Sequence, residues 1–412
     1  TDSSSIKSLA GGAGIGTGGA GVGIAIGVNV ITADVTATIL DSVVTTTGTG
    51  NVLVRADEGA SIESISLGLG GGSSVGVAGS LSINVMVTNA TASIDGESMV
   101  DAAGTVHVRA LHDGYVGVIA GQVSVGGTAG VGASITNADL FMTTTATISG
   151  SAQVDAGTAG PAVTDIHGDS REGVVVEAQT DTDVAIFAVG GSVGGTAGVA
   201  GSLALTIIDQ TTTASIGDRP SDAPDDAEVT SESDVAILAE TTGQLIGGVG
   251  AIAIGGTAGV GIGADVGVMT VRVTAEIGED AKVSASRHVI IDARNDTRII
   301  SVSISGALGG VAAVALTAGV SALNLTTKAL IGADATVLAD GNVVVSAEDL
   351  TRVDLVAGSI AGGGTAAIGV AAGIGVLTKH TEAAIGADAK VTALGRHGVV
   401  TVNSGALTDT ST

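Results

Sequence analysis

The chain has 412 residues and a formal net charge of −26; it contains no cysteine, and glycine supplies 67 residues. The negative charge argues against nucleic acid and anionic membrane surfaces as partners, and the lack of cysteine excludes disulfides and thiol catalysis. The only aromatic residues are Tyr115, Phe141 and Phe187, so a core has to be built from Val, Ile, Leu and Ala. A mean hydropathy of +0.56 is too high for a disordered chain, and we expect it to fold.

The first predicted element is a long β-strand that follows a Gly-rich turn. Apolar residues alternate with small ones from Val22 to Val30, and a period of two is typical of a strand with one apolar face. The opposite face is nearly bare, so another layer could approach it closely. The residues of that bare face are Gly23, Ala25, Gly27 and Asn29. Between Val30 and Ala33 the apolar set moves from even to odd numbers, which predicts a bulge or corner in the strand.

A short motif that ends in Ile recurs seven times along the chain. The Ile residues are Ile39, Ile94, Ile148, Ile216, Ile277, Ile331 and Ile385, separated by 55, 54, 68, 61, 54 and 54 residues. The repeat is therefore about 54 residues long, with loop insertions near residues 157–170 and 218–225. All three prolines lie in the insertions, which predicts hydrogen-bonded sheet in the repeat bodies because proline cannot donate to a strand ladder.

Each Ile is followed by a turn, a short strand, a second turn and a further strand that leads to the next Gly-rich turn. No segment has the period of a helix, so the sequence predicts an all-β fold. A parallel β-solenoid with about seven large coils fits best, since equivalent residues of successive coils would then stack, and the Ile residues would form one buried column. The alternative is an array of antiparallel β-sandwiches. Residues 1–412 are predicted to form one continuous array.

The two ends of the chain resemble two parts of the same strand. Residues 399–412 match its beginning and residues 1–12 match its end and the following turn. We therefore expect the chain to be a segment of a longer fibre or to pair axially with further copies, favoured by raised salt, because open strand edges promote association.

Four carboxylates in the second insertion are the candidate calcium ligands. They are Asp218, Asp222, Asp225 and Asp226. Prolines and small residues dominate this loop and no EF-hand order is present, so a solvated loop is favoured over a calcium site and no cofactor is expected. His107 and His112 are the only close pair of histidines, but a spacing of five places them on opposite faces of a strand. The Gly and Asp turns, such as Gly278 to Asp280, are attributed to ordinary turn chemistry.

Several segments read Gly-Gly-Thr-Ala-Gly-Val, as at Gly126 to Val131. They are followed by alternating small and aliphatic residues and then by motifs such as Thr274-Ala-Glu-Ile277-Gly278. These units resemble the repeats of large bacterial surface proteins, namely leukotoxin-type filamentous adhesins and related haemagglutinin-like β-strand-repeat proteins. The resemblance covers essentially the whole chain. It implies secretion to the cell surface, an elongated β-rich stalk and a role in attachment or in an extracellular matrix, and it supplies no catalytic residues.

A structural, non-enzymatic fibre segment is therefore the expected function. The alternative is a filament or biofilm-matrix subunit that polymerises end to end. Carboxylate pairs for glycoside or polyuronide cleavage are the enzymatic possibility, but sugar clefts usually use aromatic platforms, and this chain has almost no aromatic residues. The expected partners are further repeats or copies along the fibre axis and an unidentified ligand on a host or neighbouring cell, without membrane insertion.

Overall fold

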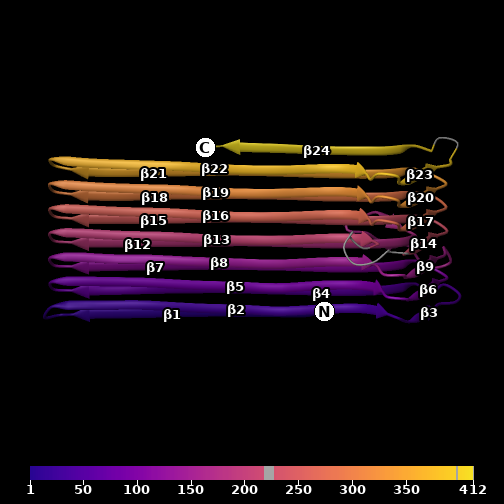
Figure 1. Cartoon of the computed structure of the whole chain (residues 1–412). Coiled ribbons are helices and arrows are strands. Elements are labelled where there is room, and N and C mark those ends of the chain that lie inside the picture. Colours follow the sequence, from indigo (N-terminus) through magenta and orange to yellow (C-terminus); the bar gives the residue numbers. More distant parts are fainter. Residues whose placement is uncertain (218–226, 396–397, 412) are drawn as a thin grey trace.

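The computed structural model describes residues 1–217, 227–395 and 398–411, which wind into seven stacked coils of a parallel β-solenoid (Figure 1). Each coil contains two long strands and one short strand. Sheet A consists of β1 (Asp2–Gly16), β4 (Val52–Gly72), β7 (Val106–Gly126), β12 (Gly173–Gly194), β15 (Asp234–Gly255), β18 (Val289–Gly309), β21 (Val343–Gly363) and β24 (Val400–Ser411). In residues 1–217, 227–395 and 398–411, no helix is long and apolar enough to cross a membrane.

The other two sheets repeat along the same axis. Sheet B consists of β2 (Ala20–Leu40), β5 (Val75–Asp95), β8 (Ala129–Ile148), β13 (Ala197–Ile216), β16 (Ala258–Ile277), β19 (Ala312–Ile331) and β22 (Ala366–Ile385). Sheet C consists of the short strands β3 (Val43–Thr45), β6 (Met99–Ala102), β9 (Gln153–Ala156), β14 (Glu228–Ser231), β17 (Lys282–Ala285), β20 (Thr336–Ala339) and β23 (Lys390–Ala393). All pairings within the three sheets are parallel, so the predicted solenoid is confirmed and the sandwich alternative is wrong.

The predicted bulge within the long strand is wrong. Strand β2 pairs with β5 without interruption from Ala20 to Leu40, and every second residue points inward throughout. The apolar residues, rather than the backbone, change face at this point. Val30 and the alternate residues before it point outward, whereas Ile31 and the alternate residues after it point inward. Each coil is thereby divided into two halves of opposite chemistry.

The wide half contains sheet C and the adjoining parts of the two long sheets. In coil 2 it comprises residues 52–63 and 86–102, and its inward side chains form the hydrophobic core of the solenoid. The Ile column predicted from the sequence lies here. Ile277 is 0% exposed, Ile94, Ile148, Ile216 and Ile331 are also buried, and Ile39 and Ile385 of the terminal coils are less covered. The column is confirmed.

The narrow half lies next to the Gly-rich turn and comprises residues 64–85 in coil 2 and their equivalents in the other coils. Here the two long sheets approach so closely that a Cβ added at Gly70 would lie 1.8 Å from the carbonyl oxygen of Val77, and one at Gly23 would lie 1.8 Å from that of Leu69. Glycine is required at both positions because the opposing atoms are backbone. The close approach predicted for the bare face is confirmed, but this part of the interior consists mainly of Gly, Ala and Ser rather than of larger aliphatic residues.

The corner after the Ile column is built by ordinary turn chemistry. Asp280, Asp334 and Asp388 have positive φ angles of 58°, 57° and 56°, and Gly96 and Gly150 have φ of 70° and 67° in earlier coils. Asp and Gly are among the residues that tolerate this left-handed conformation best. The interpretation of these residues as turn formers is confirmed for the corner.

The terminal strands β1 and β24 lie at opposite edges of sheet A, as Figure 1 shows. Following the pairing from strand to strand places Ala406 at the register of Asp2 and Ser411 at the register of Lys7. The two strands therefore cover the beginning and the end of one long strand, as expected, and share the registers from Asp2 to Lys7.

Candidate functional site

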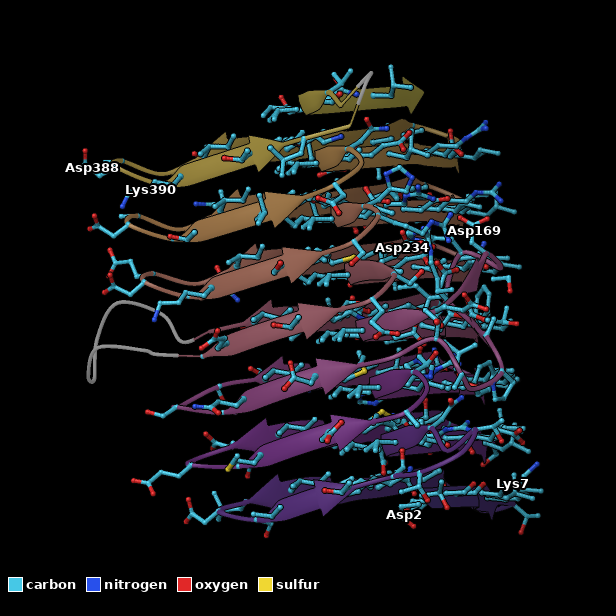
Figure 2. All side chains as sticks on the ribbon, turned by 90° about the vertical axis from the view of Figure 1, so that its right-hand side faces the viewer. Asp2, Lys7, Asp169, Asp234, Asp388 and Lys390 are labelled. Atoms are coloured by element: carbon cyan, nitrogen blue, oxygen red, sulfur yellow. The ribbon has the colours of Figure 1, made fainter. Side chains whose placement is uncertain are left out.

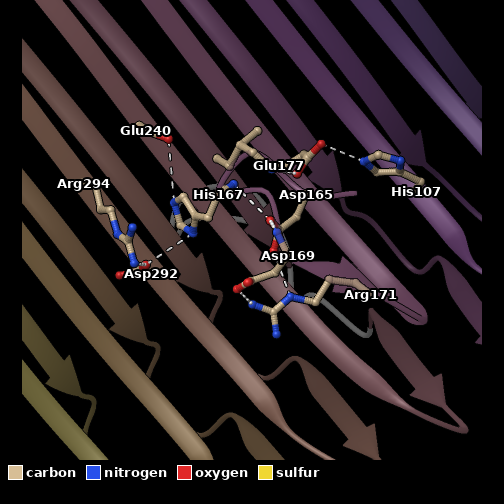
Figure 3. Close-up of polar contacts among 10 residues, drawn as sticks. His107, Asp165, His167, Asp169, Arg171, Glu177, Glu240, Asp292 and Arg294 are labelled. Atoms are coloured by element: carbon tan, nitrogen blue, oxygen red, sulfur yellow. Dashed lines mark hydrogen bonds and ion pairs between the residues drawn. The ribbon is translucent and has the colours of Figure 1, made fainter. Parts of the chain in front are cut away.

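The first insertion folds back onto the outer surface of sheet A in the wide half and forms a polar clamp. It contains a small antiparallel pair of strands, β10 (Val163–Thr164) and β11 (Ser170–Arg171). The clamp residues in and around the loop are Asp165, His167, Asp169 and Arg171, and those beneath it are His107, Glu177, Glu240, Asp292 and Arg294 (Figure 3). Arg109 also lies beneath the loop, beside Glu177. The insertion thus leaves the sheets, as predicted, but it packs against the coils.

Asp165 organises the loop from within. Its buried carboxylate accepts hydrogen bonds from the backbone N–H groups of His167 and Asp169, at 3.0 and 2.8 Å, and from Arg171 Nε at 2.8 Å. Burial alone would raise the pKa of Asp165, but the hydrogen bond from Arg171 and the backbone donors outweigh it and hold the pKa below the ordinary value of 3.8. The loop is therefore built around an ionised carboxylate.

Glu177 of β12 connects the loop to the sheet. Its side chain is fully buried, and Oε2 accepts a hydrogen bond from the backbone N–H of Ile166 at 2.9 Å. The other oxygen, Oε1, lies 2.8 Å from His107 Nε2 and 3.1 Å from Arg109 Nε, both on β7. A buried carboxylate needs partners of this kind because an isolated one is costly to desolvate.

His167 extends the clamp over two further coils. Its Nε2 lies 3.7 Å from Glu240 Oε2 on β15, and its Nδ1 lies 3.7 Å from Asp292 Oδ2 on β18, which also binds Arg294 at 2.8 Å. Burial and the neighbouring Arg294 lower the pKa of His167, although Asp292, Asp165 and Asp169 act in the opposite direction. Burial raises the pKa of Glu240. The clamp as a whole thus spans four consecutive strands of sheet A, from β7 to β18.

A second polar feature runs inside the wide half, along the solenoid axis. One inward register of sheet A holds Glu58, His112, Thr180, Thr241, Asn295 and Asp349. His112 Nε2 lies 2.9 Å from Thr88 Oγ1 of sheet B, and Lys379 Nζ lies 2.9 Å from Asp349 Oδ1. Burial lowers the pKa of His112 to about 4. Hydrogen bonds of this polar column join neighbouring coils, for example between Thr212 Oγ1 and Thr241 Oγ1 at 2.7 Å and from Asn295 Nδ2 to Asp349 Oδ1 at 3.1 Å.

The structure separates the two histidines that are close in sequence. His107 points outward beneath the clamp, whereas His112 points inward to the polar column, so the prediction of opposite faces is confirmed. The candidate calcium ligands Asp218, Asp222, Asp225 and Asp226, with the second insertion, lie outside the described residues. In the part of the chain that the structure describes, no group of three or more His, Asp or Glu side chains is arranged to hold a metal ion.

Charge is distributed very unevenly between the two halves of each coil. Seven nearly uncharged segments form the narrow half, one per coil. They are residues 8–30, 64–85, 118–139, 186–207, 247–268, 301–322 and 355–376, and the only charged residues in them are Asp139 and Asp265. The charged side chains gather instead around the wide half and the outer corner, where Asp388 and Lys390 project (Figure 2). This periodic absence of charge is visible in the sequence, but the search for repeated motifs does not reveal it.

The outward side chains of the narrow half form an apolar surface on sheet B, which we call the outer B face. It consists of six outward positions on each of seven strands, namely Ala20, Val22, Ile24, Ile26, Val28 and Val30 of β2 and their register equivalents. All of these residues except Asn137 and Asp139 are Gly, Ala, Val, Leu or Ile. Several of its side chains on the central strands are exposed, for example Ile262 at 44% and Leu316 at 37%, whereas those on β5 and β13 are half-buried.

Comparisons with models of known families, with curated proteins and with solved structures found no match to this chain.

Proposed function

We propose that the chain is a structural, non-enzymatic segment of a secreted bacterial surface fibre, in which it projects or scaffolds an attachment function carried elsewhere. The observation that supports this proposal most directly is the in-register parallel stacking of all three sheets. Each coil presents nearly the same cross-section to the next, and the Ile column and the polar column run along the same axis. Repeats that contact only their neighbours form elements that can be lengthened by adding units.

The dimensions suit such a role. Strands in a sheet are about 4.8 Å apart, so seven coils extend roughly 34 Å along the axis. The clamp and the polar column each connect several coils, which opposes bending or separation of neighbouring coils. A stalk needs this axial rigidity, whereas a binding head would need a distinct surface.

A rigid spacer can be tested by placing one small reporter domain at each end of the chain and measuring their separation by small-angle scattering or energy transfer. We expect the separation to stay constant and to increase by about 4.8 Å for each coil added from the same repeat. A broad distribution of distances, or a separation that does not increase with coil number, would contradict the proposal.

The second candidate is a subunit that polymerises end to end. It is favoured by the unpaired edges that β1 and β24 present in the same sheet, because an added copy could continue the hydrogen-bonding pattern. Their shared registers, Asp2 to Lys7 and Ala406 to Ser411, mean that one strand has to release its overlapping segment. Removing residues 406–412 should therefore promote axial filaments in electron micrographs, especially at raised salt. Particles that never lengthen along the coil axis would argue against polymerisation.

A further inference from the structure

The outer B face is unusual because it is both apolar and backed by a very thin interior. In most solenoids and sheets the larger aliphatic side chains point into the core. In the narrow half, the glycines occupy the inside and the aliphatic residues the outside, as Gly23 and Ile24 illustrate. These exposed residues contribute little to the interior of their own coil, so their surface is available for an intermolecular contact.

The face is large enough for a stable interface. Its six outward positions extend over ten residue steps of about 3.3 Å, or roughly 33 Å, and its seven strands cover roughly 34 Å along the axis. The area is therefore about 1,000 Å² on each copy, and pairing of two copies would bury about 2,000 Å², at the upper end of standard stable interfaces. The corresponding surface on sheet A has only four outward positions per strand, from Ile65 to Gly71 in β4, and covers about 700 Å².

The shape and charge of the face also suit a second copy. The strands of sheet B lie side by side with little change of direction along the stack (Figure 1), so two such sheets can pack face to face at about 10 Å. The net charge of −26 would normally oppose self-association. Because the charged residues lie in the wide half, face-to-face pairing keeps most of them away from the contact and in solvent.

We propose that two copies of this chain pair laterally through the outer B face, with sheet B of one packed against sheet B of the other. This inference does not depend on the proposed function, since it rests on the surface alone. In a fibre it would join two stalks along their length. A lipid surface fits less well because the neighbouring outward row lacks the Trp, Tyr, Lys and Arg that anchor proteins at membrane interfaces. That row is Thr32, Val87, Phe141, Asp209, Thr270, Asn324 and Thr378.

Asp139 on β8 provides an internal probe of the proposal. It is the only charged residue on the face, where Val85 and Ile207 are its register neighbours, and its Oδ2 accepts a hydrogen bond from Asn137 Nδ2 at 3.0 Å. Pairing would remove this carboxylate from water, which is unfavourable. Replacing it with Val, as in the preceding coil, should therefore tighten the pair at least tenfold.

Sedimentation equilibrium of the full chain tests the pairing. We expect a monomer–dimer equilibrium that Ile262→Asp combined with Leu316→Asp weakens at least a hundredfold. The matched control is Thr270→Asp combined with Asn324→Asp, which places two carboxylates on the same two strands, β16 and β19, but beyond the face. It should leave the equilibrium within a fewfold of the native value. Circular dichroism and thermal unfolding of each variant establish that the chain remains folded.

A second measurement identifies the buried surface directly. Because the chain contains no cysteine, an environment-sensitive dye on Ile262→Cys or on Thr270→Cys is attached at a single position. We expect the dye at 262, but not at 270, to become shielded as the protein concentration rises. A native chain that remains monomeric at all concentrations, or a dimer that both charge variants weaken equally, would overturn the inference. Flotation of monomers with phosphatidylcholine vesicles, lost in the Ile262→Asp variant, would assign the face to lipid instead.

Discussion

The two halves of each coil achieve the same sheet stacking in opposite ways. In the wide half, aliphatic side chains such as Ile277 fill the interior and polar residues face solvent, which is the usual arrangement of a soluble β-protein. In the narrow half, backbone approaches backbone at glycines such as Gly198, and aliphatic residues such as Ile262 face outward. Stability in the wide half thus depends on side-chain packing, whereas in the narrow half it depends on the absence of side chains. The difference leads to distinct responses to mutation and to pH.

The largest effect is expected in the core of the wide half. Ile277→Asp would place an unpaired carboxylate in the Ile column, between Ile216 and Ile331 of the adjoining coils, and should lower the free energy of unfolding by about 4 kcal/mol. Chemical denaturation measures this change. Asp280→Asn, at the exposed left-handed corner three residues away, is the control and should change stability by less than about 0.5 kcal/mol. Equal effects of the two substitutions would contradict the column.

The next effect concerns the response of the wide half to acid. The pKa of His112 is about 4 in the folded chain, against 6.5 ordinarily, because burial disfavours the charged imidazole. Its contribution to stability is complete above pH 6.5 and is lost as the pH falls towards 4, by about 3 kcal/mol at most. His112→Thr, which reproduces Thr180 of the next coil, should remove this part of the pH dependence. Denaturation between pH 7 and pH 4 measures it, and the exposed His380→Thr is the control.

A smaller effect distinguishes the interior of the narrow half from its surface. A Cβ at Gly198 would lie 2.2 Å from the carbonyl oxygen of Ile254 and 2.9 Å from its nitrogen, so Gly198→Ala has to push the two sheets apart. Overpacking of this kind costs about 2 kcal/mol. Gly250 points outward, and its Cβ would contact only Val189 at 3.7 Å, so Gly250→Ala should be neutral or slightly stabilising. Thermal unfolding of both variants is the measurement. A destabilised Gly250→Ala with an unaffected Gly198→Ala would reverse the assignment of inside and outside.

Sequence periodicity could predict the solenoid, its coil number and the Ile column because each depends on residue type at a fixed spacing. It could predict that another layer can approach the bare face of residues 22–30, but not that the apolar face of this segment points to solvent, since an apolar face usually points into the core. The distance between the two long sheets determines which face points inward, and this distance depends on the tertiary structure. For the same reason, the shift of apolar residues near Ile31 predicts a change in the backbone, although only the residue types change there. The clamp could not be predicted, because Glu177 and His167 meet residues of other coils that have no regular spacing from them.

The smallest effect is expected at Asp265, which departs from the uncharged chemistry of the narrow half. This inward residue is the register equivalent of Ala204 and Gly319, and its carboxylate accepts a hydrogen bond from Ser301 Oγ. Burial raises the pKa of Asp265 above 3.8, although the hydrogen bond from Ser301 opposes the shift. A raised folded-state pKa means that the contribution of Asp265 to stability is complete below about pH 3.8 and is lost as the pH rises through the folded value.

Asp265→Asn keeps the shape without the charge, so it should stabilise the chain by about 1 kcal/mol at pH 7 and progressively less towards pH 4. The pH dependence of Asp265 therefore has the opposite sign to that of His112. Denaturation of Asp265→Asn and of Asp209→Asn, whose carboxylate lies outward beside Arg272, provides the comparison. A gain for Asp265→Asn that is the same at both pH values would show that the carboxylate is not desolvated, and that the narrow half admits water between its sheets.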